Sequence, residues 1–156
     1  MNLNEQLNRI KNIMYETPQV DVKSHGEFDD DFGKILEIQT SDSLPVGKMY
    51  VTTMENAKNV DPDFIKLFDE KRFQTIPLNY QNSLFMHSLN IDKNLQRKGF
   101  GSQLLDRCHE IAKQNGFNYL TFIADKDNSV AKNLYKKRGY NLLNSDKGSE
   151  FYFVEL

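Results

Sequence analysis

The segment QRKGFGS at residues 96–102 has the residue types of an anion-binding loop. It contains Gly99 and Gly101, two positions apart, directly after the basic pair Arg97 and Lys98. Glycine lets a backbone approach a ligand closely, and the free N–H groups and the dipole at the start of a helix attract negative charge. Because a run with helical spacing follows, we expect these amides to bind a phosphate group. The alternative for an isolated G-x-G is a tight turn without a ligand.

The spacing of the glycines excludes two common nucleotide-binding motifs. A phosphate-binding loop of the G-x-x-x-x-G-K-[ST] kind is absent from the sequence. A dinucleotide fingerprint needs a third glycine three residues after Gly101, and Leu104 stands there. Any phosphate at this loop must therefore belong to another class of ligand.

The loop is expected to lie between a strand and a helix. Residues 84–91 carry apolar side chains at odd and even positions, which is typical of a central strand covered on both faces. Residues 102–115 have a helical apolar stripe that ends at Gly116, where glycine suits a left-handed cap. Residues 119–124 are predicted to form the next strand. This order predicts a βαβ unit with parallel, adjacent strands.

Elements on both sides of this unit extend the predicted sheet. Toward the C-terminus we expect a helix over residues 129–138 and strands at 140–143 and 150–156, around a turn at 144–149. Toward the N-terminus the sequence predicts a hairpin of strands 32–40 and 48–54, with a turn at 41–47. A further helix is expected from the Asp61-Pro62 start signal to about Phe73.

The first 31 residues are expected to form a helix followed by a polar arm. Four apolar residues at spacings of four, three and four predict a helix over residues 3–15 whose stripe should be buried: Leu3, Leu7, Ile10 and Met14. Residues 17–31 are polar and end in an acidic run at 27–31, which indicates a loop. Such a run is usually a solvated surface, and the alternative is attraction of a cationic acceptor.

Composition indicates one soluble domain covering residues 1–156. The chain has 20 Lys and Arg against 22 Asp and Glu, so no global basic field indicates a nucleic-acid partner. There is no apolar run of membrane-spanning length and no signal-peptide pattern, and we expect a cytoplasmic protein without a membrane partner. The predicted fold is α/β (α+β), with a mixed central sheet flanked by helices.

Two blocks of the sequence resemble the GNAT superfamily of acyl-CoA-dependent N-acetyltransferases. LNIDKNLQRKGFG at residues 89–101 is similar to its acyl-CoA signature, which ends in [QR]-x-x-G-x-[GA] at the start of a helix. DNSVAKNLYKKRGY at residues 127–140 is similar to its second block, N-x-x-A-x-x-x-Y-x-x-x-G-[FY]. The resemblance covers residues 84–143. Before residue 80 the predicted order of elements departs from the family, in the part that usually shapes the acceptor site.

The resemblance implies acetyl-CoA, or another acyl-CoA, as co-substrate. The strand edge would bind the pantetheine arm, the loop amides would hold the pyrophosphate, and two side chains seven residues apart would face the thioester. The implied cofactor-binding residues are Leu89, Asn90, Ile91, Gln96, Arg97, Lys98, Gly99, Phe100, Gly101, Ser102, Asn128 and Tyr135.

The implied reaction is acyl transfer to a primary amine by direct attack in a ternary complex. It requires a deprotonated amine and a proton for the departing thiolate. Tyr135 is the candidate acid, and the alternative is a tyrosine that only packs beneath the sheet. His87 is the candidate base. The alternative is that His87 has a structural role and that a Glu, an Asp or a water chain acts as the base.

Other chemistries find less support in the sequence. Cys108 lies on the apolar helix stripe, where a buried thiol makes a poor nucleophile, and one cysteine excludes an internal disulfide. His25, His87 and His109 show no ligand spacing, so no metal is expected.

The competing function is a non-catalytic acyl-CoA-binding module that acts in an assembly through the N-terminal stripe. An intact Asn128 and Tyr135 favour the enzyme. The sequence leaves open the acceptor, which could be a small molecule, a peptide or a protein, and the oligomeric state, including a homodimer.

Overall fold

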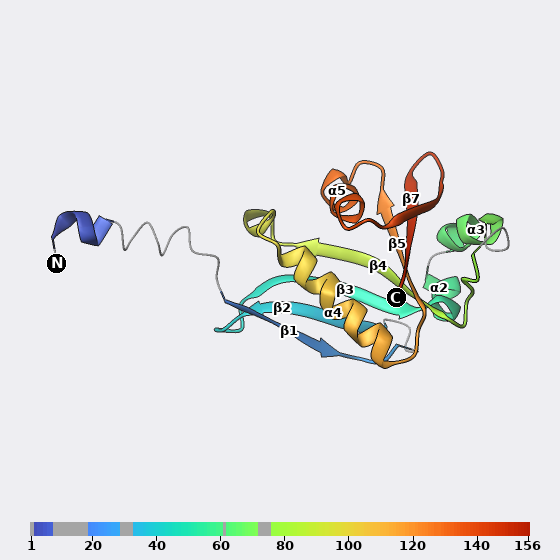
Figure 1. Cartoon of the computed structure of the whole chain (residues 1–156), viewed down its shortest axis with the longest axis horizontal. Helices are drawn as coiled ribbons and strands as arrows, with labels where there is room; N and C mark the ends of the chain where they lie inside the picture. The colour runs from blue at the N-terminus through green and yellow to red at the C-terminus, as the bar shows by residue number, and fades with distance from the viewer. Residues whose placement is uncertain (1, 8–18, 29–32, 61, 72–75) are drawn as a thin grey trace.

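The computed structural model describes residues 2–7, 19–28, 33–60, 62–71 and 76–156. Within them the chain forms a mixed sheet in the order β1-β2-β3-β4-β5-β7-β6, flanked by helices (Figure 1). The strands are β1 (Val20–His25), β2 (Lys34–Thr40), β3 (Pro45–Thr53), β4 (Ser83–Ile91), β5 (Tyr119–Asp125), β6 (Asn141–Ser145) and β7 (Ser149–Glu155). The helices are α2 (Met54–Val60), α3 (Pro62–Lys71), α4 (Phe100–Gln114) and α5 (Ser129–Lys137), with the 3-10 helix η1 (Lys93–Leu95).

The predicted βαβ unit is confirmed. β4 and β5 pair in parallel and are adjacent, and β4 is the central strand of the sheet. α4 connects them and is capped at its end by Gly116, whose φ is +79°. The predicted hairpin is also confirmed, because β2 and β3 are antiparallel neighbours, although β3 already begins at Pro45.

Two hydrophobic cores lie on opposite faces of the sheet. On one face α4 packs across β2, β3 and β4, as Figure 1 shows, and Leu84 and Met86 of β4 are fully buried there. On the other face α2 and α3 pack over the sheet, and Phe85 of β4 points into their core. Alternation along β4 therefore places consecutive residues in different cores.

Two predictions for the N-terminal half are wrong. Residues 20–25, predicted as a loop, form the edge strand β1, because Val20 and Val22 pack against the core while the residues between and after them stay polar. This alternation is short and lies within an acidic segment. Helix α2 was not predicted at all. It begins at Met54, where a continuing strand was expected, and Thr53 Oγ1 accepts a hydrogen bond from the Asn56 N–H at its start.

The N-terminal stripe is only partly described. Residues 3–7 are helical, as predicted, but Leu3 and Leu7 are 69% and 51% exposed, so their expected burial does not occur. Ile10 and Met14 lie outside the described residues. In the described parts of the chain, no helix is long and apolar enough to cross a membrane.

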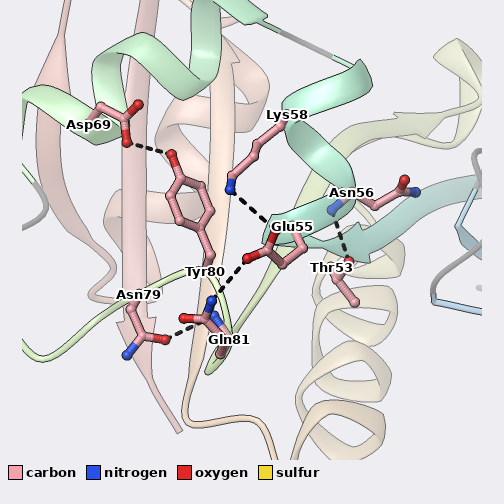
Figure 2. Close-up of polar contacts among 8 residues, drawn as sticks. All are labelled: Thr53, Glu55, Asn56, Lys58, Asp69, Asn79, Tyr80 and Gln81. Atoms are coloured by element: carbon pink, nitrogen blue, oxygen red, sulfur yellow. Dashed lines mark hydrogen bonds and ion pairs between the residues drawn. The ribbon is translucent and has the colours of Figure 1, made fainter.

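A polar cluster joins α2 and α3 to the turn before β4 (Figure 2). The Tyr80 hydroxyl donates a hydrogen bond to Asp69 of α3, and Lys58 of α2 lies 3.9 Å from the centroid of the Tyr80 ring. Glu55 accepts hydrogen bonds from Lys58 at 3.2 Å and from Gln81 at 2.9 Å. Because Tyr80 is also buried against Phe68, this cluster fixes both helices to the start of the central strand.

We expect Tyr80→Phe to lower the free energy of unfolding by about 1–2 kcal/mol, because it deletes a hydrogen bond to a carboxylate and keeps the ring packing. Urea denaturation monitored by circular dichroism measures this change. Asp69→Asn and the double variant complete a mutant cycle, and strict additivity of the two single effects would contradict a direct interaction.

Candidate functional site

β4 and β5 stop pairing midway along their length. Their parallel register runs from Ser83↔Tyr119 to Met86↔Phe122. Beyond Met86, β4 continues beside β3 to Ile91, whereas β5 continues beside β7. Figure 1 shows the two strands separating. The sheet therefore opens at its centre, directly before the loop that the sequence singled out.

A β-bulge marks the place where the strands separate. Tyr50 of β3 is opposite Ser88 and the next residue, Val51, is opposite Met86, so His87 is an extra residue in β4. The extra residue reverses the alternation of the strand. As a result Leu89 and Ile91, like Met86 before them, pack on the face covered by α4.

The glycine loop turns the chain from β4 into α4. Gly99 precedes the helix with a φ of +84°, and Arg97 also has a positive φ, of +64°. At Gly101 a Cβ atom would lie 3.0 Å from Leu134 Cδ2 of α5, so the missing side chain lets the two helices approach closely. The first N–H groups of α4 have no carbonyl partners one turn earlier and are directed at this loop.

A pocket of about 400 Å³ lies between the end of β4, the loop and α5. Its lining residues are Leu89, Asn90, Ile91, Leu95, Gln96, Arg97, Gly99, Phe100, Gly101, Ser102, Asn128, Val130, Ala131, Asn133, Leu134 and Lys137. Every residue of the sequence-predicted cofactor site belongs to this lining except Lys98 and Tyr135. The structure therefore brings two separated sequence blocks together at one pocket.

The α5 wall, meaning the residues of α5 that line the pocket, is the part of the site that was not predicted from the sequence. Val130, Leu134 and Lys137 recur at spacings of four and three, which places them on one face of the helix, with Asn133 beside them. This spacing was readable from the sequence. The contact of Leu134 with Gly101 determines which face of α5 meets α4. This contact joins residues far apart in the chain, so a local sequence pattern cannot predict it.

The pocket suits an anion with an apolar extension. Arg97 and Lys137 contribute positive charge, and no carboxylate side chain is among the lining residues. The dipole of α4 adds positive potential at its start. Leu89, Ile91 and Leu95 give the part near β4 an apolar surface. This local positive potential contrasts with the net charge of the whole chain, which is −2.

Tyr135 lies beside the pocket, in the core. It is 1% exposed, and its ring centroid is 5.2 Å from Phe122, 5.5 Å from Tyr152 and 5.8 Å from Tyr140. Burial raises the pKa of its phenol well above the usual range. Asn128 does line the pocket, but its side chain also caps α5 by accepting a hydrogen bond from the Ala131 N–H at 3.1 Å.

His87 lies on the sheet at the bulge. It is half-buried, and its ring centroid lies 5.4 Å from that of Tyr50 and 5.9 Å from that of Phe85. Because Phe85 belongs to the core under α2 and α3, these contacts place His87 on the face opposite α4. The pocket lining does not include His87.

Cys108 is buried in the core, and burial raises its thiol pKa to about 12. A thiol in this state is a poor nucleophile. Among the described residues there is no group of three His, Cys, Asp or Glu side chains that could hold a metal ion.

Comparison with known proteins agrees with the two sequence blocks. The model of the Acetyltransferase (GNAT) family matches residues 64–140. The chain is 33% identical over 63 residues to GCN5-related N-acetyltransferase 10, chloroplastic, of Arabidopsis thaliana, and 32% identical over 54 residues to the uncharacterized protein YxbD of Bacillus subtilis strain 168. These alignments cover 40% and 35% of this chain but 25% and 34% of the two relatives, so the chain matches only a minor part of each.

Solved structures share the fold over a larger part of the chain. The PaiA N-acetyltransferase of Thermoplasma acidophilum, in complex with coenzyme A, has a TM-score of 0.57 at 15% identity, covering 98% of this chain and 70% of that one. An acetyltransferase of Bacillus cereus has a TM-score of 0.56 at 16% identity, covering 100% and 94%. Residues 64–140 thus match the GNAT family of acetyltransferases, and the fold of the whole chain is similar to that of solved acetyltransferases.

Proposed function

We propose that the protein transfers an acetyl group from acetyl-CoA to a primary amine by direct attack in a ternary complex. The observation that carries this proposal is the pocket where β4 and β5 separate, which ends at the first turn of α4. A pocket with an apolar surface near β4 and backbone amides at the start of α4 matches a ligand with an apolar arm and a pyrophosphate. The structural relative from Thermoplasma acidophilum was solved with coenzyme A.

In this proposal the cofactor lies along the end of β4. The backbone of residues 89–91 binds the pantetheine arm, and the N–H groups from Arg97 to Ser102 bind the pyrophosphate. Gln96, whose side chain donates a hydrogen bond to the Ile91 carbonyl at 3.3 Å, holds the loop against the strand. Lys98 lies outside the pocket lining and adds charge beside the loop.

The candidate acid and base lie near the point where the strands separate. Tyr135 contacts Phe122, the last residue of β5 that pairs with β4. His87 directly follows Met86, the partner of Phe122. Tyr135 belongs to the core on the α4 face and His87 lies on the opposite face, so a thioester that reached this point would have the phenol on one side and the imidazole on the other.

Each group then has a defined role. His87 removes a proton from the attacking amine, and Tyr135 gives a proton to the sulfur as the thiolate leaves. Because burial raises the pKa of Tyr135, the phenol stays protonated at working pH and holds the proton that the reaction consumes. The buried position of Tyr135 also suits the competing function, a module that binds acyl-CoA without turnover.

We expect Gly101→Asp to weaken coenzyme A binding by about a hundredfold or more. The new side chain would press on Leu134, 3.0 Å from its Cβ, and would place a negative charge at the anion site. Isothermal titration calorimetry measures the affinity. Gln103→Asp is the matched control, because it places the same charge on α4 outside the pocket lining. Unchanged affinity in a folded Gly101→Asp protein would exclude this cofactor site.

We expect Tyr135→Phe to lower kcat by at least about tenfold with little change in coenzyme A affinity, because it deletes the donated proton and keeps the ring. Steady-state thiol release from acetyl-CoA with a panel of amines measures the rate. Tyr140→Phe controls for loss of a hydroxyl in the same aromatic cluster. Full activity in Tyr135→Phe would assign the proton to another donor, and coenzyme A binding without turnover in the wild type would favour the non-catalytic module.

We expect His87→Gln to lower kcat/KM by about 10- to 100-fold near neutral pH, where the acceptor amine is mostly protonated, and by less as the pH rises. The physical reason is that free amine forms without help at high pH. A pH profile of kcat/KM for both proteins tests this, with added imidazole as a rescue. If the two profiles are parallel, His87 has a structural role and a carboxylate or water is the base.

A further inference from the structure

The strand β1 leaves one edge of the sheet open. Among the described residues it pairs only with β2, and Figure 1 shows it at the outer edge of the sheet. All six of its residues pair with β2 without a register shift. A regular edge strand exposes a row of backbone N–H and C=O groups, so it can accept a further strand.

The other edge strand of the described sheet, β6, is less suited to such pairing. Its register with β7 shifts between Leu142 and Asn144, and the Asn144 side chain donates a hydrogen bond to the Leu67 carbonyl of α3. A bulge bends a strand and interrupts its row of backbone groups. Of these two edges, β1 is therefore the better template for a new strand.

An open groove of about 400 Å³ lies beside β1, between this strand and α4. Val20 and Val22 line it, and both are only partly buried. Its α4 wall includes Gln103, Arg107 and Glu110, whose spacings of four and three place them on one face of the helix. Arg107 and Glu110 form an ion pair at 2.7 Å, so this wall carries both signs of charge. The groove shares no lining residue with the cofactor pocket.

The sequence of β1 is complementary to itself when two copies pair antiparallel. Directly opposed residues lie on the same face, so only alternate registers keep Val22 on the α4 face in both copies. Pairing about Val22 places the exposed Asp21 opposite the exposed Lys23 of the second copy, twice by symmetry. Pairing about Asp21 or about Lys23 would oppose like charges, which destabilises a sheet. The charges of β1 thus favour one register.

We propose that a second copy of this chain pairs with β1 through its own β1, antiparallel and centred on Val22. The two sheets then form one continuous sheet. A twofold axis perpendicular to the sheet keeps both α4 helices on the same side, so each brings its wall of Arg107 and Glu110 to the joint. This inference does not depend on acetyl transfer, because none of these residues lines the cofactor pocket.

Sedimentation velocity of the intact protein over a concentration series measures the dimer. The wild type should dimerise as its concentration rises. Asp21→Lys should raise the dimer dissociation constant by about tenfold or more, because lysines then face each other at two places, and Lys23→Asp should do so through two aspartate pairs. An equimolar mixture of the two variants should associate within about threefold of the wild type, because the new lysine of one faces the new aspartate of the other.

Asp42→Lys is the matched control, because Asp42 is exposed in the turn between β2 and β3, away from the edge. It should leave the dissociation constant unchanged. Circular dichroism establishes that each variant is folded, since Lys23 also lies opposite Glu37 of β2 within one chain. A wild type that is monomeric at every concentration would overturn the proposal. So would equal weakening by Asp42→Lys, or a mixture of folded variants that associates no better than either alone.

Oxidative cross-linking tests the same register without changing a charge. Two copies of Val22 that face each other have Cα atoms about 4.5–5.5 Å apart, so Val22→Cys should form an intermolecular disulfide. Ser24→Cys is the control, because its two copies would lie roughly 13 Å apart along the strands. The native Cys108 is buried and does not compete. On a non-reducing gel, no covalent dimer in Val22→Cys, or as much in Ser24→Cys, would overturn this interface.

Discussion

The early end of the pairing between β4 and β5 is the constraint on which the rest of the site depends. Two parallel strands that paired along their whole length would fill the centre of the sheet with their own hydrogen bonds. Here the extra residue His87 shifts the register of β4, and pairing with β5 ends at the preceding residue. The chain thereby gives up ladder hydrogen bonds between the two strands, and the pocket lies beyond this point, between the end of β4, the loop and α5.

The walls of this pocket are held by contacts behind it. Tyr135 and Tyr140 pack with Phe122 of β5, and Tyr135 also packs with Tyr152 of β7, so these rings fix α5 to both strands. Arg138, at the end of α5, donates hydrogen bonds to Asp106 at 2.6 Å and to the Ser102 carbonyl at 3.4 Å, both on α4. The Asp106 carboxylate is exposed, so this pair adds little stability and serves mainly to orient the two helices.

The helices on the opposite face are consecutive in the chain and directly precede the central strand. α2 and α3 lie between β3 and β4, and they cover the sheet on the side where His87 packs. The Tyr80 cluster fastens them to the turn that begins β4. A helix pair directly before the central strand can thus be positioned by that strand, and the match to the family model begins within this pair, at residue 64 of α3.

Local signals in the sequence were sufficient for the central part of this protein. The glycines of the loop, the helix stop at Gly116 and the two blocks around residues 89–101 and 127–140 are short-range patterns, since turn geometry and helix caps depend on a few neighbouring residues. They predicted the βαβ unit and most of the pocket lining, and the turn residues at 41–47 between two short strand patterns predicted the hairpin. The same patterns left the cofactor and catalytic roles as proposals.

Tertiary structure alone determined the remaining features. The edge strand β1 exists because β2 offers it a partner, and the bulge at His87 exists only as a mismatch between β4 and β3. The burial of Tyr135 and the α5 wall depend on where one helix meets another. Strand register, burial and helix contact join residues far apart in the chain, and the free energy of such contacts is not contained in any local stretch of sequence.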